Sequence, residues 1–216
     1  MRHLWTIALV VLIVSCTDTD NSYDGFSDWR ARNDVWFAQV INTARADIAA
    51  KGEASPWRIR RTLLKTYTAE GVDSNYVVMK YLGKTDEPDN DDPEFGTKSP
   101  TYTDTVCIAY RGWLMERMDY VYNETELSNV KTVFTQTYFG DFDPGTAGVV
   151  ESQVSSYTEG FATALQYMKS RERWMIYIPS GLGYGSREVS IVPAYSTLQF
   201  EVWMHSWRRS TIPGDM

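Results

Sequence analysis

The chain has 216 residues, of which 43% are hydrophobic and 23% charged, the balance of an ordinary globular protein with one medium domain and extensions. Aromatic residues make up 14% of the chain, enough for a sizeable core and for rings in a binding cleft. The formal net charge of −7 argues against an electrostatic grip on nucleic acid or on anionic lipid. We therefore expect no nucleic-acid partner.

Residues 1–16 have the pattern of a leader segment. Every residue from Leu4 to Val14 except Thr6 is apolar, but the run is shorter than the about 20 residues that span a membrane. The run ends in Ile-Val-Ser-Cys, which resembles the lipobox of bacterial lipoproteins, where cleavage precedes the cysteine and its thiol carries lipid. This resemblance implies lipidation at Cys16, on a protein of the cell envelope whose acyl chains hold it on the outer membrane. A buried apolar helix or strand is the alternative.

Residues 17–26 are polar and are expected to form a flexible tether. Its acidic start, Thr-Asp-Thr-Asp, is similar to export signals of surface lipoproteins in some bacteria with two membranes. A short acidic tether is also simply well solvated. The sequence leaves open whether the protein faces the periplasm or the cell surface.

A helical extension is expected over residues 27–58. Apolar side chains recur with helical spacing at Phe37, Ile41, Ala44 and Ile48, which predicts a helix with one apolar face. The helix should stop at a glycine and a proline that follow. Its apolar face needs a partner surface, either on the following domain, on a second copy or on another protein.

The rest of the chain alternates between short segments of strand composition and polar connections. A capping-box sequence at residues 156–159 predicts one short helix with Phe161, Leu165 and Met168 on its inward face. Residues 115–131 are expected to be irregular, and the acidic segment 83–104 to be a hydrated loop, with a calcium site as a weaker alternative. Strands are expected at residues 60–68, 76–82, 105–114, 133–138, 174–178 and 197–204. The pattern predicts an α+β fold in which an antiparallel β-sheet packs on one short α-helix, with an additional N-terminal helix.

Few groups suited to nucleophilic or metal chemistry are present. Without the leader, His205 is the sole histidine and Cys107 the sole thiol beyond the lipid site, so a zinc-type ligand cluster and an intrachain disulfide cannot form. Catalysis by a Ser-His-Asp or Cys-His arrangement would depend on His205 alone. No nucleophile elbow and no phosphate-binding loop of the Walker type is present.

Several motifs in the second half of the chain resemble those of one family, the FKBP-type peptidyl-prolyl isomerases. The most specific is Ile-Pro-Ser-Gly-Leu-Gly-Tyr-Gly at 178–185, followed by Ile-Val-Pro at 191–193 and Thr-Leu-Gln-Phe-Glu-Val at 197–202. Weaker matches lie upstream at 108–112, 133–137 and 159–161. The resemblance covers about 105–204 and implies an FKBP-like domain over 59–207, with a C-terminal tail at 208–216.

The resemblance also implies a site and a chemistry. An X-Pro amide crosses a barrier of about 18–20 kcal/mol between cis and trans, and this barrier can be lowered without nucleophile, metal or cofactor. Phe161 would form the floor of a proline pocket, and Tyr184 would donate its hydroxyl to a substrate carbonyl. The walls and rim would be formed by Tyr110, Phe134, Phe200 and Val192. The expected activity is isomerisation of X-Pro bonds in exported polypeptides, with no cofactor and no metal.

Five positions depart from the family pattern. Phe161 stands where the family usually has tryptophan, and Thr135 where it has aspartate. Tyr157 and Thr158 replace a Val-Ile pair, and Val150 stands for a phenylalanine. Because each change alters the volume or polarity of the pocket, an isomerase-inactive binding or chaperone module of the same fold is the alternative function. The sequence does not name clients or an oligomeric state.

Overall fold

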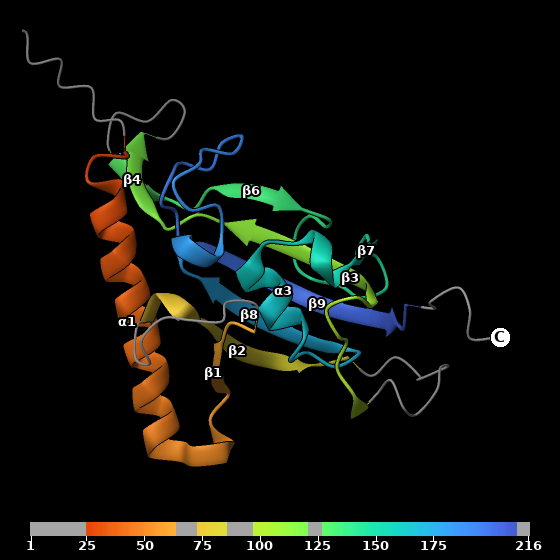
Figure 1. Ribbon diagram of the computed structural model, residues 1–216. Coiled ribbons are helices and arrows are strands. Elements are labelled where there is room, and N and C mark those ends of the chain that lie inside the picture. Colours follow the sequence, from red (N-terminus) through yellow and green to blue (C-terminus); the bar gives the residue numbers. More distant parts are fainter. Residues whose placement is uncertain (1–24, 64–72, 86–96, 121–126, 211–216) are drawn as a thin grey trace, which may run out of the picture.

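The computed structural model of the chain describes residues 25–63, 73–85, 97–120 and 127–210 (Figure 1). The leader with Cys16, the tether up to residue 24, residues 86–96 of the acidic loop and residues 211–216 lie outside these ranges. The described helices are α1 (Trp29–Lys51) and α3 (Glu159–Leu165). The described strands are β1 (Trp57–Arg61), β2 (Tyr76–Lys84), β3 (Thr105–Trp113), β4 (Arg117–Tyr120), β5 (Leu127–Val130), β6 (Val133–Gln136), β7 (Val150–Gln153), β8 (Glu172–Ile178) and β9 (Leu198–Arg208).

The described strands form one seven-stranded sheet and a separate two-stranded hairpin. The order in the large sheet is β1-β2-β8-β9-β3-β6, with β7 also paired to β3, and every pairing is antiparallel. The short helix α3 lies against this sheet (Figure 1). The predicted α+β fold is therefore confirmed.

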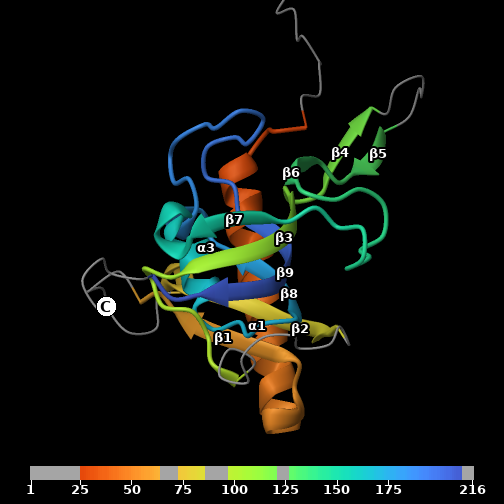
Figure 2. The ribbon, with the colours of Figure 1, turned by 90° about the vertical axis from the view of Figure 1, so that its right-hand side faces the viewer.

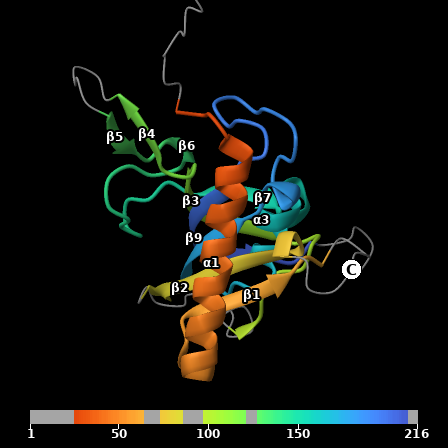
Figure 3. The same ribbon diagram turned by 90° about the vertical axis from the view of Figure 1, so that its left-hand side faces the viewer.

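The two helices pack on opposite faces of the sheet, and strand β2 shows why. Its side chains alternate, so that Val77 and Met79 join the main core with α3, whereas Val78 points to the other face. There it packs against Phe37 and Ile41 of α1. Figure 3 shows α1 crossing β1 and β2. The partner surface of the N-terminal helix is thus the sheet of its own chain.

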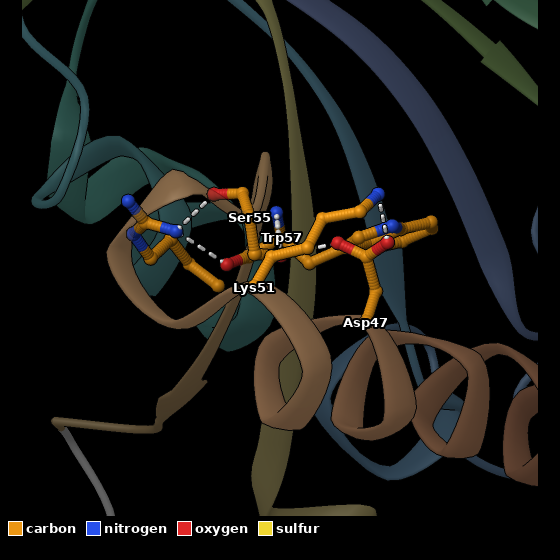
Figure 4. A network of polar contacts seen from close by, with 5 residues as sticks. Asp47, Lys51, Ser55 and Trp57 are labelled. Carbon is orange, nitrogen blue, oxygen red and sulfur yellow. Dashed lines mark hydrogen bonds and ion pairs between the residues drawn. The ribbon is translucent and has the colours of Figure 1, made fainter.

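A small polar network ends α1 and turns the chain into β1 (Figure 4). The Asp47 carboxylate accepts a hydrogen bond from the Lys51 ammonium at 2.5 Å and one from the Ser55 hydroxyl at 2.6 Å. The Ser55 Oγ in turn accepts the backbone N–H of Trp57 at 3.1 Å. The donors Lys51 and Ser55 lower the pKa of Asp47 below its ordinary value.

None of the described helices has the length and apolar character needed to cross a bilayer.

Most predicted strands are confirmed, with shifted ends. The predicted pairing of the first two strands is confirmed, but the first begins at Trp57, so the last residues of the expected helical extension 27–58 belong to a strand. The side chains of Trp57 and Ile59 alternate with arginines and pack toward α1. This alternation has the period of a strand, and it begins inside the segment that was expected to be a helical extension. The last strand runs on to Arg208.

Two expectations about the connections were wrong. Residues 115–131 were expected to be irregular, but β4 and β5 pair there as a hairpin that projects from the sheet (Figure 2). The capping box is also absent, because α3 starts after Thr158 without a side-chain cap. Ser156 belongs to a preceding 3₁₀ helix, and the carboxylate of Glu159 accepts a hydrogen bond from the Thr62 hydroxyl at 2.5 Å. Ser156 therefore does not occupy the N-cap position that a capping box requires, and the Glu159 carboxylate makes a tertiary contact.

Candidate active site

A cavity of about 360 Å³ lies where α3, β3, β6 and β9 meet the loop formed by residues 183–197, which we call the pocket loop. Every pocket residue expected from the sequence lines this cavity, except Val150. The lining residues are Tyr110, Phe134, Thr135, Ser156, Tyr157, Thr158, Phe161, Tyr184, Val189, Ser190, Val192 and Phe200.

Phe161 lies at the centre of the aromatic lining. Its ring centroid is 4.7 Å from that of Phe200 and 5.9 Å from that of Tyr110, both in edge-to-face geometry. Tyr157 packs beside it with a centroid distance of 4.9 Å and an interplanar angle of 31°. Phe161 is only 3% exposed. Phe161 is thus a buried ring of the lining, which agrees with a pocket floor, and that role stays a prediction. Tyr157 packs beside Phe161, whose ring is smaller than the indole usual in the family.

Glycines allow the elements around the cavity to approach closely. A Cβ at Gly112 in β3 would lie 2.7 Å from Phe200 and 2.8 Å from Phe134, well inside van der Waals contact. A Cβ at Gly160 in α3 would overlap Ile178 and lie 3.1 Å from Leu182. The absence of a side chain at Gly112 therefore leaves space for the rings of Phe200 and Phe134, and its absence at Gly160 lets α3 pack closely against β8.

Backbone hydrogen bonds shape the pocket loop. The N–H of Gly185 donates to the carbonyl of Ser180 at 2.8 Å, and Gly185 has φ +63°, a conformation that favours glycine. Val189 and Val192 pair across the tip through two bonds of 3.0 and 2.9 Å. The tight turn presents Tyr184 to the cavity, and the tip turns Val192 inward, where it is buried.

The phenols of Tyr157 and Tyr184 stay protonated at neutral pH. Burial, and secondarily the nearby Tyr110, raise the pKa of Tyr157 to about 12. The same two causes raise the pKa of Tyr184. Neutral phenols are hydrogen-bond donors, and none of the lining residues in the described part of the chain carries a formal charge. Across the described ranges, no three His, Cys, Asp or Glu side chains gather where they could hold a metal ion.

Val150 does not line the cavity, contrary to expectation. It begins β7, pairs with Ile108 of β3 and is 38% exposed. Its assignment rested only on the resemblance, in which Val150 stands for a family phenylalanine, whereas its position in the fold is set by the pairing of β7 with β3. The sequence prediction also missed Ser156, Val189 and Ser190. The close spacing of Val189 and Val192 around a turn was the one local pattern that could have predicted this part of the cavity lining.

Comparison with known families agrees with this geometry. Residues 96–205, just over half of the chain, match the family model described as FKBP-type peptidyl-prolyl cis-trans isomerase. The chain belongs to this family. The matched range holds the whole cavity lining, whereas β1, β2 and α1 precede it. In this chain the sheet therefore also contains two strands, β1 and β2, that precede the matched range.

Solved structures similar to this FKBP-type chain come from bacteria and plants. Escherichia coli FkpA is 16% identical with a TM-score of 0.49, over 86% of this chain and 64% of that chain. A Pseudomonas syringae peptidyl-prolyl cis-trans isomerase is 17% identical with a TM-score of 0.44, over 80% of this chain and 96% of that one. Wheat FKBP73 is 20% identical with a TM-score of 0.40, over 64% and 47%. This chain thus spans less than two thirds of FkpA and about half of the wheat protein.

Proposed function

We propose that this chain is a peptidyl-prolyl cis-trans isomerase, or folding helper, that acts on X-Pro bonds of exported polypeptides. The observation that carries the proposal is the convergence of aromatic rings from α3, β3, β6, β9 and the pocket loop on one uncharged cavity. Such a lining suits the proline ring, which is apolar and lacks an N–H.

The proposed chemistry needs no bond to the protein. Rotation about the X-Pro amide breaks its conjugation, so the twisted form is less polar than the planar form and is favoured when water is excluded. Phe161 and its neighbours supply the dry surface. The Tyr184 hydroxyl holds the substrate by a hydrogen bond to a carbonyl. Proline-containing polypeptides are the proposed partners.

Tyr184→Phe is expected to lower kcat/KM roughly 2–10-fold, because it removes one hydrogen bond worth about 0.5–1.5 kcal/mol and leaves the ring in place. The measurement is cis-trans exchange of a prolyl tetrapeptide by NMR, without a coupling protease. Tyr177→Phe is the matched control, since this phenol lies on β8 outside the cavity and its removal should leave the rate unchanged.

Two results would count against this reading. An equal loss in Tyr184→Phe and Tyr177→Phe would remove the specific role of the Tyr184 hydroxyl. Peptide binding by the wild-type protein without any enhanced exchange would favour the second candidate, an inactive binding or chaperone module. That candidate draws support from Thr135 and Phe161, which replace the family's usual aspartate and tryptophan, and from Tyr157 beside the floor ring.

We further propose that the protein is a lipoprotein of the cell envelope, held on the outer membrane through Cys16. The support is the leader pattern of residues 1–16 and its lipobox-like end. The wild-type precursor expressed in a bacterium with two membranes is expected to incorporate a labelled fatty acid and to sediment with membranes. Cys16→Ser should lose both properties, whereas Cys107→Ser should keep them. Labelling that persists in Cys16→Ser would refute the anchor.

A further inference from the structure

We propose that the first turns of α1 position the pocket loop, which makes the N-terminal helix a working part of the prolyl-binding site. Its effect on catalysis rests on the proposed isomerase function, whereas the positioning itself does not. Helix α1 lies outside the family match at 96–205. Figures 1 and 2 show the pocket loop beside the first turns of α1.

Asn33 is the first part of this connection. It is a polar residue with 0% exposure on the face of α1 that otherwise buries Trp29, Phe37 and Ile41. Its Oδ1 accepts the backbone N–H of Thr197 at 2.8 Å, and its Nδ2 donates to the carbonyl of Trp29 at 2.8 Å. A residue that only packs would be apolar here, because a buried amide is tolerated only when it is hydrogen-bonded. Asn33 thus binds the backbone at the end of the pocket loop.

Trp29 makes the second connection. Its indole N–H donates to the Ser196 hydroxyl oxygen at 2.9 Å, and the Ser196 hydroxyl donates to the carbonyl of Pro193 at 2.7 Å. Trp29 is 6% exposed, so this chain of bonds is shielded from water and geometrically well defined. Pro193 directly follows the cavity residue Val192.

The third connection reaches Tyr184. The guanidinium of Arg30 lies 4.3 Å from the ring centroid of Tyr195, within range for a cation–π contact. Tyr195 has φ +61°, an unfavourable conformation for a residue with a Cβ, which persists only where neighbours hold it. Its N–H donates to the carbonyl of Gly185 at 2.7 Å. The helix therefore contacts the last residues of the pocket loop directly. Through Tyr195 and Gly185 it is also connected to the start of the loop, next to Tyr184.

The test compares variants of α1 that lose a hydrogen bond to the pocket loop with a variant of the same helix face that loses only packing. Asn33→Ala removes the bond to Thr197, and Trp29→Phe removes the bond to Ser196 while retaining a ring. Phe37→Leu is the control, because Phe37 belongs to a hydrophobic cluster with Val78 and β1 that includes no residue of the pocket loop. Amide hydrogen exchange of Tyr195 and Thr197 in the full-length folded domain reports on the loop without reference to activity.

Asn33→Ala and Trp29→Phe are expected to speed exchange of these amides roughly 2–10-fold, the effect of losing one hydrogen bond. In the isomerase assay they should raise KM more than they lower kcat. Trp29→Phe combined with Ser196→Ala should speed exchange no more than Ser196→Ala alone, because Ser196→Ala already removes the bond to Trp29 together with the bond to Pro193. Phe37→Leu should change neither quantity, even if it lowers the melting temperature as much.

Pocket-loop exchange that stays at the wild-type rate in Asn33→Ala, or rises equally in Phe37→Leu, would overturn the positioning role. An inactive wild-type protein would refute the proposed isomerase function instead, and the exchange data would still decide the role of α1. Faster exchange of the pocket-loop amides with an unchanged KM would mean that α1 stabilises the loop without affecting substrate binding. This result would also overturn the proposal.

Discussion

Phe161→Ala is expected to lower the free energy of unfolding by roughly 3–5 kcal/mol and to abolish prolyl exchange. The ring is 3% exposed and contacts Phe200, Tyr110 and Tyr157. Its removal leaves a void under the pocket that rigid neighbours can fill only in part, and it removes the surface on which a proline ring would rest. Urea unfolding measures the first effect and NMR exchange of a prolyl peptide measures the second.

Met168→Ala separates stability from catalysis. Met168 is fully buried in the same core cluster but does not line the cavity, and its truncation should destabilise by roughly 2–5 kcal/mol. The rate per folded molecule should remain at the wild-type level. If Met168→Ala abolished exchange as Phe161→Ala does, the loss would report unfolding, and the role of Phe161 as the pocket floor would lose its support.

Gly112→Ala should close the pocket from its wall. The added methyl would lie 2.7 Å from Phe200, 2.8 Å from Phe134 and 2.9 Å from Thr135, whereas carbon atoms in contact are about 3.5–4.0 Å apart. Because both rings line the cavity, we expect them to yield toward it. We expect a loss of stability of about 1–3 kcal/mol and, from about 1.4 kcal/mol of lost binding, roughly tenfold weaker affinity for a prolyl peptide.

Gly181→Ala is the matched control, because no heavy atom lies within 4 Å of the methyl it would add. Peptide affinity is measured by titration followed by NMR or calorimetry, and stability by urea unfolding. If Gly112→Ala bound the prolyl peptide with wild-type affinity, the rings of Phe200 and Phe134 would not narrow the cavity. The role of Gly112 in keeping the cavity open would then be wrong.

The features that the sequence by itself determined are those with a local physical cause. The helix α1 follows from apolar side chains at helical spacing, and the strands β2, β3 and β9 follow from alternation and β-branched composition. The motif at residues 178–185 places Tyr184 in a tight glycine-rich turn, because only certain residues adopt the backbone conformations of that turn. The predicted cavity residues other than Val150 also came from motifs in fixed order along the chain.

The tertiary structure alone decided the rest, because those features depend on partners distant in the chain. Thr62 donates a hydrogen bond to Glu159 from nearly a hundred residues away, and the pairing of Val150 with Ile108 places Val150 outside the cavity. Asn33 is the clearest case. It was not singled out from the sequence, and its role depends on Thr197, which lies across from it only in the folded chain. Local sequence encodes backbone preference and periodicity, whereas a hydrogen bond between distant elements depends on how those elements pack.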